Sequence, residues 1–196
     1  MHQTLSVPDA LASRARRLDE GDFSTQPFVH PGQVTSPRLV DVTSGQITEE
    51  LRVAVPPGAN VGRALHRVLD DLGPRAGCGR IVGGICQRIQ YHVMIRAAAG
   101  VKPYVYGSPI VVDGQSMLIS AAITVGHKDD GARILHCHGG FTDENGKAHG
   151  GHIILDETVA GGDGLVVRLC LFDGVDFVVT PDTETTFDLL KPVTKL

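Results

Sequence analysis

The residue types best suited to chemistry are three closely spaced histidines, His136, His138 and His152. Residues two apart on a β-strand point to the same face, so His136 and His138 share one side of a strand while Cys137 points to the other. Imidazole nitrogens bind zinc and other divalent transition metals. Three protein ligands leave a fourth metal position open, which is typical of catalytic zinc sites. The spacing predicts a three-histidine metal site, provided that the chain brings His152 beside the other two.

The segment between these histidines contains Glu144-Asn145-Gly146, which predicts a hairpin turn. A three-residue loop commonly ends in a residue at positive φ, a position that suits Gly146. Such a loop places His138 opposite His152 and His136 opposite Ile154, with the Cβ atoms of opposed residues about 4.5–5.5 Å apart. His149 has the other parity and is expected to point away. The hairpin therefore brings three imidazoles to one face.

Two alternatives to this arrangement stay open. A two-residue Asn145-Gly146 turn would shift the register by one and move His152 to the other face. The glycine pairs at 139–140 and 150–151 could also host bulges.

Histidines close together in a sequence also occur as surface or hydrogen-bonded residues without any metal. Zinc is the predicted metal, although imidazole ligands also suit copper, nickel or iron.

Candidate ligand-binding residues outside the histidine cluster are Arg80 and Arg88, which could point into a cleft and hold a carboxylate. A place on the solvated surface explains both arginines equally simply. The glycine-rich stretch 77–84 has neither the GxGxxG nor the Walker pattern, so it does not predict a phosphate site. Asp143 and Asp156 flank the hairpin and could support a histidine, although turn solvation also explains them. Four further histidines are interpreted as solvated or hydrogen-bonded residues: His30, His66, His92 and His127.

The elements that must position these residues are many strands and one helix. A helical apolar stripe between Asn60 as N-cap and Gly73 as stop predicts a helix; it consists of Val61, Ala64, Leu65, Val68, Leu69 and Leu72. A loop or irregular hairpin is expected over 101–114. Strands are expected at 38–43, 50–55, 77–89, 91–95, 117–125, 134–142, 165–172 and 176–179. This pattern predicts an α/β fold of the α+β type, with a mostly antiparallel sheet packed against one main helix.

Bulk composition predicts a polar N-terminal arm at residues 1–28 and a single domain at 29–196. The chain has 196 residues, of which 42% are hydrophobic and 20% charged, as in ordinary globular proteins. Its net charge of −4 argues against a broad nucleic-acid-binding surface. Without a secretory signal or an apolar stretch of ~20 residues, we expect a cytoplasmic protein with no membrane partner. No CxxC pair occurs, and buried free thiols are expected at Cys78, Cys86, Cys137 and Cys170.

The histidine segment resembles the plants-and-prokaryotes-conserved (PPC) domain family, in a longer bacterial form. The resemblance rests on His136-Cys137-His138, the Asn145-Gly146 turn and Gly150-Gly151-His152, together with the strand that begins at Ser116. It covers residues 51–179, which are expected to form the core of the domain. The family implies an α/β fold with an antiparallel sheet, a homotrimer, and zinc held by the three matching histidines. Plant members bind DNA through an Arg-Gly-Arg-Pro AT-hook, which this chain lacks.

Two hypotheses on function follow. The first is a metal-binding PPC-domain protein with regulatory contacts to protein or DNA, although neither the charge nor an AT-hook supports DNA binding. The second is a zinc-dependent enzyme acting on a small oxo- or hydroxy-acid, in which an arginine such as Arg80 or Arg88 holds the acidic ligand. This second hypothesis draws on a fold-level resemblance to acetolactate decarboxylase, which holds zinc with a similar histidine set, and a shared fold is weak support for a shared function.

Overall fold

The structure is a computed structural model that describes residues 30–34, 43–98, 100 and 102–195. These residues form ten β-strands, one α-helix and one short 3-10 helix. The strands are β1 (Gln46–Val55), β2 (Gly77–His92), β3 (Met94–Arg96), β4 (Tyr104–Tyr106), β5 (Ile110–His127), β6 (Arg133–Thr142), β7 (Ala148–Ile153), β8 (Val159–Asp173), β9 (Val175–Pro181) and β10 (Asp188–Thr194). The helices are α2 (Val61–Leu72) and η1 (Leu155–Glu157).

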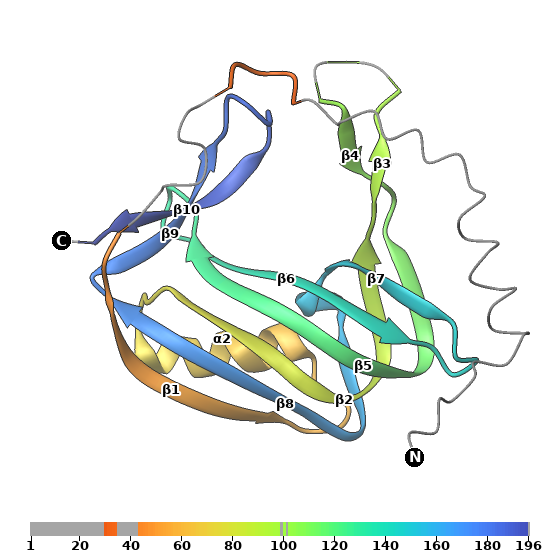
Figure 1. Cartoon of the computed structure of the whole chain (residues 1–196). Coiled ribbons are helices and arrows are strands. Elements are labelled where there is room, and N and C mark those ends of the chain that lie inside the picture. The colour runs from red at the N-terminus through yellow and green to blue at the C-terminus, as the bar shows by residue number, and fades with distance from the viewer. Residues whose placement is uncertain (1–29, 35–42, 99, 101, 196) are drawn as a thin grey trace, which may run out of the picture.

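Eight strands form one sheet in the order β1-β8-β2-β7-β6-β5-β9-β10, while β3 and β4 pair with each other. Because β2 also pairs with β5, the strands β2, β5, β6 and β7 form a closed ring of pairings. The pairings are antiparallel, apart from one parallel bridge between His127 of β5 and Val178 of β9. In Figure 1, α2 lies behind β1, β8 and β2, and the β3–β4 and β9–β10 hairpins project at opposite ends of the molecule.

Helix α2 begins and ends where the sequence predicts. The Asn60 side chain accepts a hydrogen bond from the backbone N–H of Arg63 at 2.9 Å, which satisfies one of the free donors of the first turn. Gly73 ends the helix at φ 82°, a conformation that glycine adopts without strain. The stripe side chains Leu65 and Leu69 are completely buried. Truncation of Leu65 to alanine is therefore expected to cost about 2–5 kcal/mol.

The core lies between α2 and one face of the sheet. Alternate residues of β8 point into it, and they are buried at Leu165, Val167, Leu169 and Leu171. The intervening Arg168 is exposed on the other face, as the period of two in a strand requires. The ring of strands adds Phe141 and Ile153, both almost fully buried. The side of the sheet away from α2, where Arg168 is exposed, is accessible to solvent. We call this side the open face.

The predicted fold class holds in its coarse form, because an antiparallel sheet packs on one main helix. Strands dominate the domain more than the α/β label implies. The predicted strands 77–89 and 91–95 are mostly one long strand, β2, and β3 begins only after it. The loop or irregular hairpin expected over 101–114 contains β4 and the start of β5. Strand β10 was not predicted, and the strand expected at 38–43 lies almost entirely outside the described residues.

None of the helices within the described residues has the length and apolar character needed to cross a membrane.

Candidate metal centre

The β6–β7 hairpin has the predicted register. His138 lies opposite His152, and the ladder continues to the pair Thr142 and Ala148. The predicted three-residue loop closes it, with Gly146 at φ 76°. The alternative two-residue turn is therefore wrong, and His152 shares a face with His138. The ladder ends at His152, so the expected pairing of His136 with Ile154 is absent; the Ile154 N–H donates instead to the carbonyl of Gln90.

Asp143 determines this turn geometry. Its carboxylate oxygen Oδ1 accepts the backbone N–H groups of Asn145 and Lys147, each at 2.9 Å. Its own N–H donates to the Lys147 carbonyl, and the Gly146 N–H donates to the Asp143 carbonyl, both at 2.9 Å. The side chain thus holds the loop at three residues, and with it the register that puts the histidines on one face.

The three imidazoles converge on the open face of the hairpin. Ring centroids are 4.8 Å apart for His136 and His138, 4.7 Å for His136 and His152, and 5.4 Å for His138 and His152. One nitrogen from each ring lies within 4.8 Å of the other two. A tetrahedral zinc with Zn–N bonds of about 2.0–2.1 Å needs these nitrogens roughly 3.3 Å apart. Small side-chain rotations would close the remaining gap, so the donor set and its geometry fit a metal ion.

The surroundings of His136 and His152 favour the neutral imidazole, the form that binds metal. Burial lowers the pKa of His136, and the neighbouring His138 lowers it further. Burial, His136, His138 and His92 together lower the pKa of His152 from 6.5 to about 4. The Nδ1 atom of His152 is buried, and it has no hydrogen-bond partner among the described residues. An unpaired buried nitrogen is costly unless another group, such as a metal ion, satisfies it.

Glycines allow the strands that carry the cluster to approach one another closely. A Cβ added at Gly151 would lie 2.2 Å from the carbonyl oxygen of His92, and one added at Gly139 would lie 2.7 Å from the Cβ of Ala121. The backbone pair of His92 and His152 joins β2 to β7 at this point. The bulges that the glycine pairs could have hosted are absent from the β6–β7 ladder. These glycines instead close the strand ring beneath the histidines.

His149 points to the opposite face, as its parity predicts. Its Nδ1 lies 3.0 Å from the Tyr91 hydroxyl, and its Nε2 lies 3.0 Å from the Asp143 carboxylate. The ring also stacks on Phe141, with centroids 5.1 Å apart. Hydrogen bonds from His149 and from the turn backbone lower the pKa of Asp143. Sequence reasoning did not find this network, because Tyr91 is distant in the chain and enters it through the ring of strands.

Two further aromatic residues border the cluster. The Tyr106 ring lies 5.2 Å from that of His152, and burial raises the pKa of its hydroxyl. The His92 ring stacks near His152 with centroids 6.4 Å apart, while its Nδ1 bonds the Gly107 carbonyl at 2.8 Å. His92 is therefore hydrogen-bonded, as interpreted from the sequence. Sequence reasoning missed Tyr106, although Tyr104-Val105-Tyr106 is a short run of aromatic and β-branched residues of the kind that strands favour.

The two candidate arginines lie in different surroundings. Arg80 is exposed in β2, opposite Ala122 of β5, and Ala122 in turn lies opposite His138. Because directly opposed residues share a face, Arg80 belongs to the face that carries the histidines. Arg88 instead forms an ion pair with Asp113, with 2.7 Å between the guanidinium and the carboxylate. Within the described residues no ion pair engages Arg80, so of the two it is the arginine whose charge is available on the histidine face.

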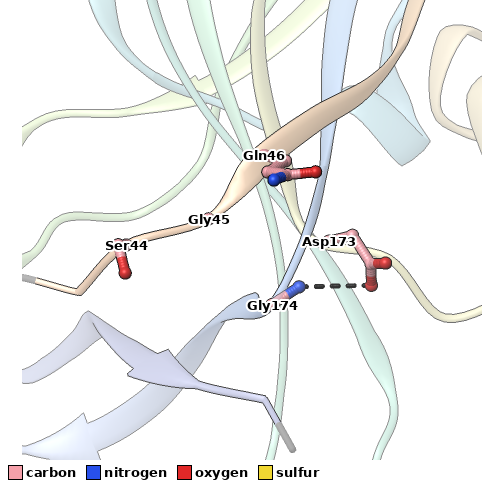
Figure 2. Close-up of a pocket in the computed structure, with 5 residues that line it drawn as sticks. All are labelled: Ser44, Gly45, Gln46, Asp173 and Gly174. Carbon is pink, nitrogen blue, oxygen red and sulfur yellow. Dashed lines mark hydrogen bonds between the residues drawn. The ribbon is translucent and has the colours of Figure 1, made fainter.

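A cavity of about 310 Å³ adjoins the cluster, and His136 is part of its lining. Another cavity, of about 430 Å³, lies at the turn between β8 and β9, and its lining includes none of the three histidines. Figure 2 shows its five lining residues, with the Gly174 N–H bonded to the Asp173 carboxylate at 3.1 Å. The Asp173 side chain is thus engaged by its own turn, and this cavity offers no convergent reactive groups.

The cysteines are free thiols, as predicted, but their burial differs. Cys86 and Cys137 are buried in the core, which raises the pKa of each thiol to about 12. Cys78 is exposed on the open face, where its strand neighbour Cys170 is half-buried. The expectation of four buried thiols is wrong for Cys78 and holds only in part for Cys170, because the parity of these two opposed residues directs them away from the core.

The fold and the cluster define a small β-rich domain with a metal-site arrangement of histidines on one hairpin. The model of the Plants and Prokaryotes Conserved (PCC) domain matches residues 42–169, and the chain belongs to that family. This confirms the resemblance seen in the histidine segment. No curated protein matches the chain.

Solved structures with the same fold share little sequence with this chain. A plant- and prokaryote-conserved protein from Pyrococcus horikoshii is 19% identical with a TM-score of 0.60, covering 84% of this chain and 100% of its own. A metal-containing protein from Archaeoglobus fulgidus is 17% identical with a TM-score of 0.60, covering 76% and 97%. A candidate DNA-binding protein from Bacteroides thetaiotaomicron is 12% identical with a TM-score of 0.56, covering 74% and 94%. At these identities the likeness concerns the fold.

Proposed function

We propose that this PCC-domain protein binds one divalent transition metal ion, zinc by preference, through His136, His138 and His152. The observation that carries the proposal is the convergence of three imidazoles, one of which has a buried nitrogen that bonds to none of the described residues. The description of the Archaeoglobus fulgidus relative as metal-containing supports it. Zinc suits a tetrahedral site with imidazole ligands, whereas oxygen-rich sites select magnesium or calcium.

The protein supplies three ligands, which leaves room for a water or a substrate oxygen. When bound, the metal would act as a Lewis acid toward a carbonyl or carboxylate and would lower the pKa of a bound water. The chain's own residues hold the imidazoles on two paired strands, which limits their movement. The Tyr106 ring lies beside that of His152, with centroids 5.2 Å apart. A rigid site with an open position suits ligand binding and catalysis better than a purely structural role.

The experiment is metal content per chain, measured by elemental mass spectrometry on protein purified without a His tag or a chelator. We expect about one equivalent of zinc in the wild type and its loss in His138→Ala, His136→Ala and His152→Ala. His66→Ala is the matched control, because His66 lies on α2 and outside the cluster. Its zinc content should equal that of the wild type. Wild-type protein that stays free of metal after zinc is added back would refute the proposal.

We also propose that the chain assembles as a homotrimer, as the family resemblance implies. Exposed apolar side chains support an association surface: Val82, Met94, Ile95, Val105, Tyr106, Met117 and Ile119 are each between 37% and 61% exposed. Static light scattering coupled to size-exclusion chromatography tests the assembly. A mass three times that of the chain is expected, and a monomer at micromolar concentration would contradict it.

DNA binding stays a prediction with little support from this chain. Relatives of the same fold are described as candidate DNA-binding proteins. Here the net charge is −4, and no AT-hook is present in the sequence. Binding that rests on phosphate contacts weakens steeply with salt. A mobility shift with duplex DNA at low salt that disappears as salt rises would support it, and no shift at low salt would exclude it.

A further inference from the structure

The cavity beside His136 has the size and lining of a small-ligand pocket. Its volume of about 310 Å³ falls at the lower end of the range for such sites. Its walls are mostly apolar and come from β6, β9 and β10: Ile134, Phe177, Val179, Leu189 and Leu190. Cys78 and Thr124 complete the floor next to His136. An apolar pocket therefore opens directly beside a proposed metal ligand.

A row of arginines runs up to the same site across the open face. Arg52, Arg168 and Arg80 lie opposite one another on β1, β8 and β2, and the row continues through Ala122 to His138. All three arginines are exposed, and within the described residues none forms an ion pair or a side-chain hydrogen bond. Glu50, two residues before Arg52 and on the same face by strand parity, is the nearest acidic residue of β1.

Three unpaired guanidinium groups in adjacent strands repel one another, which is a cost that a bound anion removes. Arg80 ends the row on the histidine side. It lies two strands from His138, roughly 9–10 Å at the usual strand spacing. The intervening Ala122 is exposed and carries no side chain long enough to obstruct the approach. Arg80 is two residues from Cys78 on the same face of β2, and Cys78 is part of the pocket lining.

The far end of the pocket has the opposite charge. Asp188 at the start of β10 is part of the lining and is exposed, and within the described residues no ion pair engages it. A ligand with an acidic group at each end would bring one of them against this carboxylate. The pocket thus offers positive charge near the histidines, apolar walls in the middle and negative charge at its far end.

We propose that this site binds a small monocarboxylic acid with a short branched apolar chain, the class of branched 2-hydroxy or 2-oxo acids. The carboxylate lies at the histidine cluster and Arg80, and the apolar chain enters the pocket formed by Phe177, Leu189 and Leu190. Asp188 excludes acids with a second carboxylate on the chain. This inference rests on the proposed metal site, because the metal would share the carboxylate with Arg80.

Three probes with the same head group test it on the zinc-loaded full chain by isothermal titration calorimetry. They are 2-hydroxyisocaproate with a branched apolar chain, lactate with no chain to fill the pocket, and 2-hydroxyglutarate with an acidic chain. We expect 2-hydroxyisocaproate to bind at least about 10-fold more tightly than either of the others, because its branched apolar chain leaves water for the apolar pocket.

Two variants and one matched control variant test which residues contact the ligand. Arg80→Ala should weaken the binding of 2-hydroxyisocaproate about 10-fold or more, because it removes a charge-assisted hydrogen bond to the carboxylate. Arg52→Ala is the matched control: it removes the same charge from the far end of the row and should change the affinity less than about 2-fold. Asp188→Asn should bring 2-hydroxyglutarate close to 2-hydroxyisocaproate in affinity.

The outcomes separate this inference from the metal site. Zinc content is measured on each variant, and Arg80→Ala and Asp188→Asn should retain the wild-type value. Wild-type protein that holds zinc but binds no probe would overturn the inference and leave the metal site standing. Equal binding of all three probes, or equal losses in Arg80→Ala and Arg52→Ala, would also overturn it. A wild type without zinc would refute the proposed function first.

Discussion

Replacement of Gly151 by alanine should damage the site without touching any histidine. The added Cβ would lie 2.2 Å from the carbonyl oxygen of His92, whereas ordinary contacts begin at 3.4 Å. The two backbones must therefore separate by about 1.2 Å, the difference between these distances. That separation acts on the pair of His92 and His152, which joins β2 to β7. Overpacking of this kind costs about 1–3 kcal/mol.

The same displacement moves His152 relative to the other two imidazoles. Zinc sites tolerate ligand distances only within ~0.2 Å of the ideal, so we expect zinc affinity to fall about 10-fold to 100-fold. Urea unfolding of the metal-free protein and a competition titration with a zinc indicator measure the two effects. Gly140→Ala is the matched control, because its Cβ would meet nothing closer than the His149 carbonyl oxygen at 3.7 Å. Zinc affinity within 2-fold of wild type in Gly151→Ala, with stability within about 0.5 kcal/mol, would refute the account of the strand ring.

Three further predictions concern the surroundings of the site. Tyr91→Phe leaves the Nδ1 of His149 without its partner at 3.0 Å and should destabilise the protein by about 1–3 kcal/mol in urea unfolding; a loss below about 0.5 kcal/mol would contradict the role of this network. The pKa of His152 is about 4 in the folded chain and 6.5 in the unfolded chain. As the pH falls, the unfolded chain therefore binds a proton at His152 before the folded chain does. Stability of the metal-free protein should therefore fall as the pH drops from 6.5 toward 4, with a shallower fall in His152→Gln; equal slopes would be inconsistent with this. Because burial raises the thiol pKa to about 12, Cys86 and Cys137 should resist alkylation at neutral pH until the protein unfolds, and rapid labelling of either in the native state would show that it is accessible.

Local sequence patterns were sufficient to predict helix α2 and the β6–β7 hairpin that carries the histidines. Asn60 and Gly73 bound α2 because capping depends on neighbours a few residues away. The register of β6 and β7 follows from strand parity and from the turn at Gly146, which are also local. Sequence alone left a two-residue turn open, and the hydrogen bonds of Asp143 exclude it.

Contacts between strands that are far apart in the chain could not be predicted from local sequence patterns. Tyr106 belongs to the separate β3–β4 hairpin yet lies next to His152 of β7, and no pattern near either residue specifies that contact. The pocket depends on β10, a strand whose residues Leu189 and Leu190 lie far along the chain from His136. The arginine row likewise depends on which strands are neighbours in the sheet. Strand order is set by the packing of the whole domain and not by local propensity.

X-ray absorption at the zinc edge tests the central claim most directly, because it reports the atoms bound to the metal in the zinc-loaded protein. The account predicts three imidazole nitrogens and one further light atom at about 2.0–2.1 Å, and loss of one imidazole in a refilled His138→Ala variant. A sulfur shell near 2.3 Å would place the metal on a cysteine such as Cys78. That result, or a spectrum unchanged by His138→Ala, would contradict the three-histidine site.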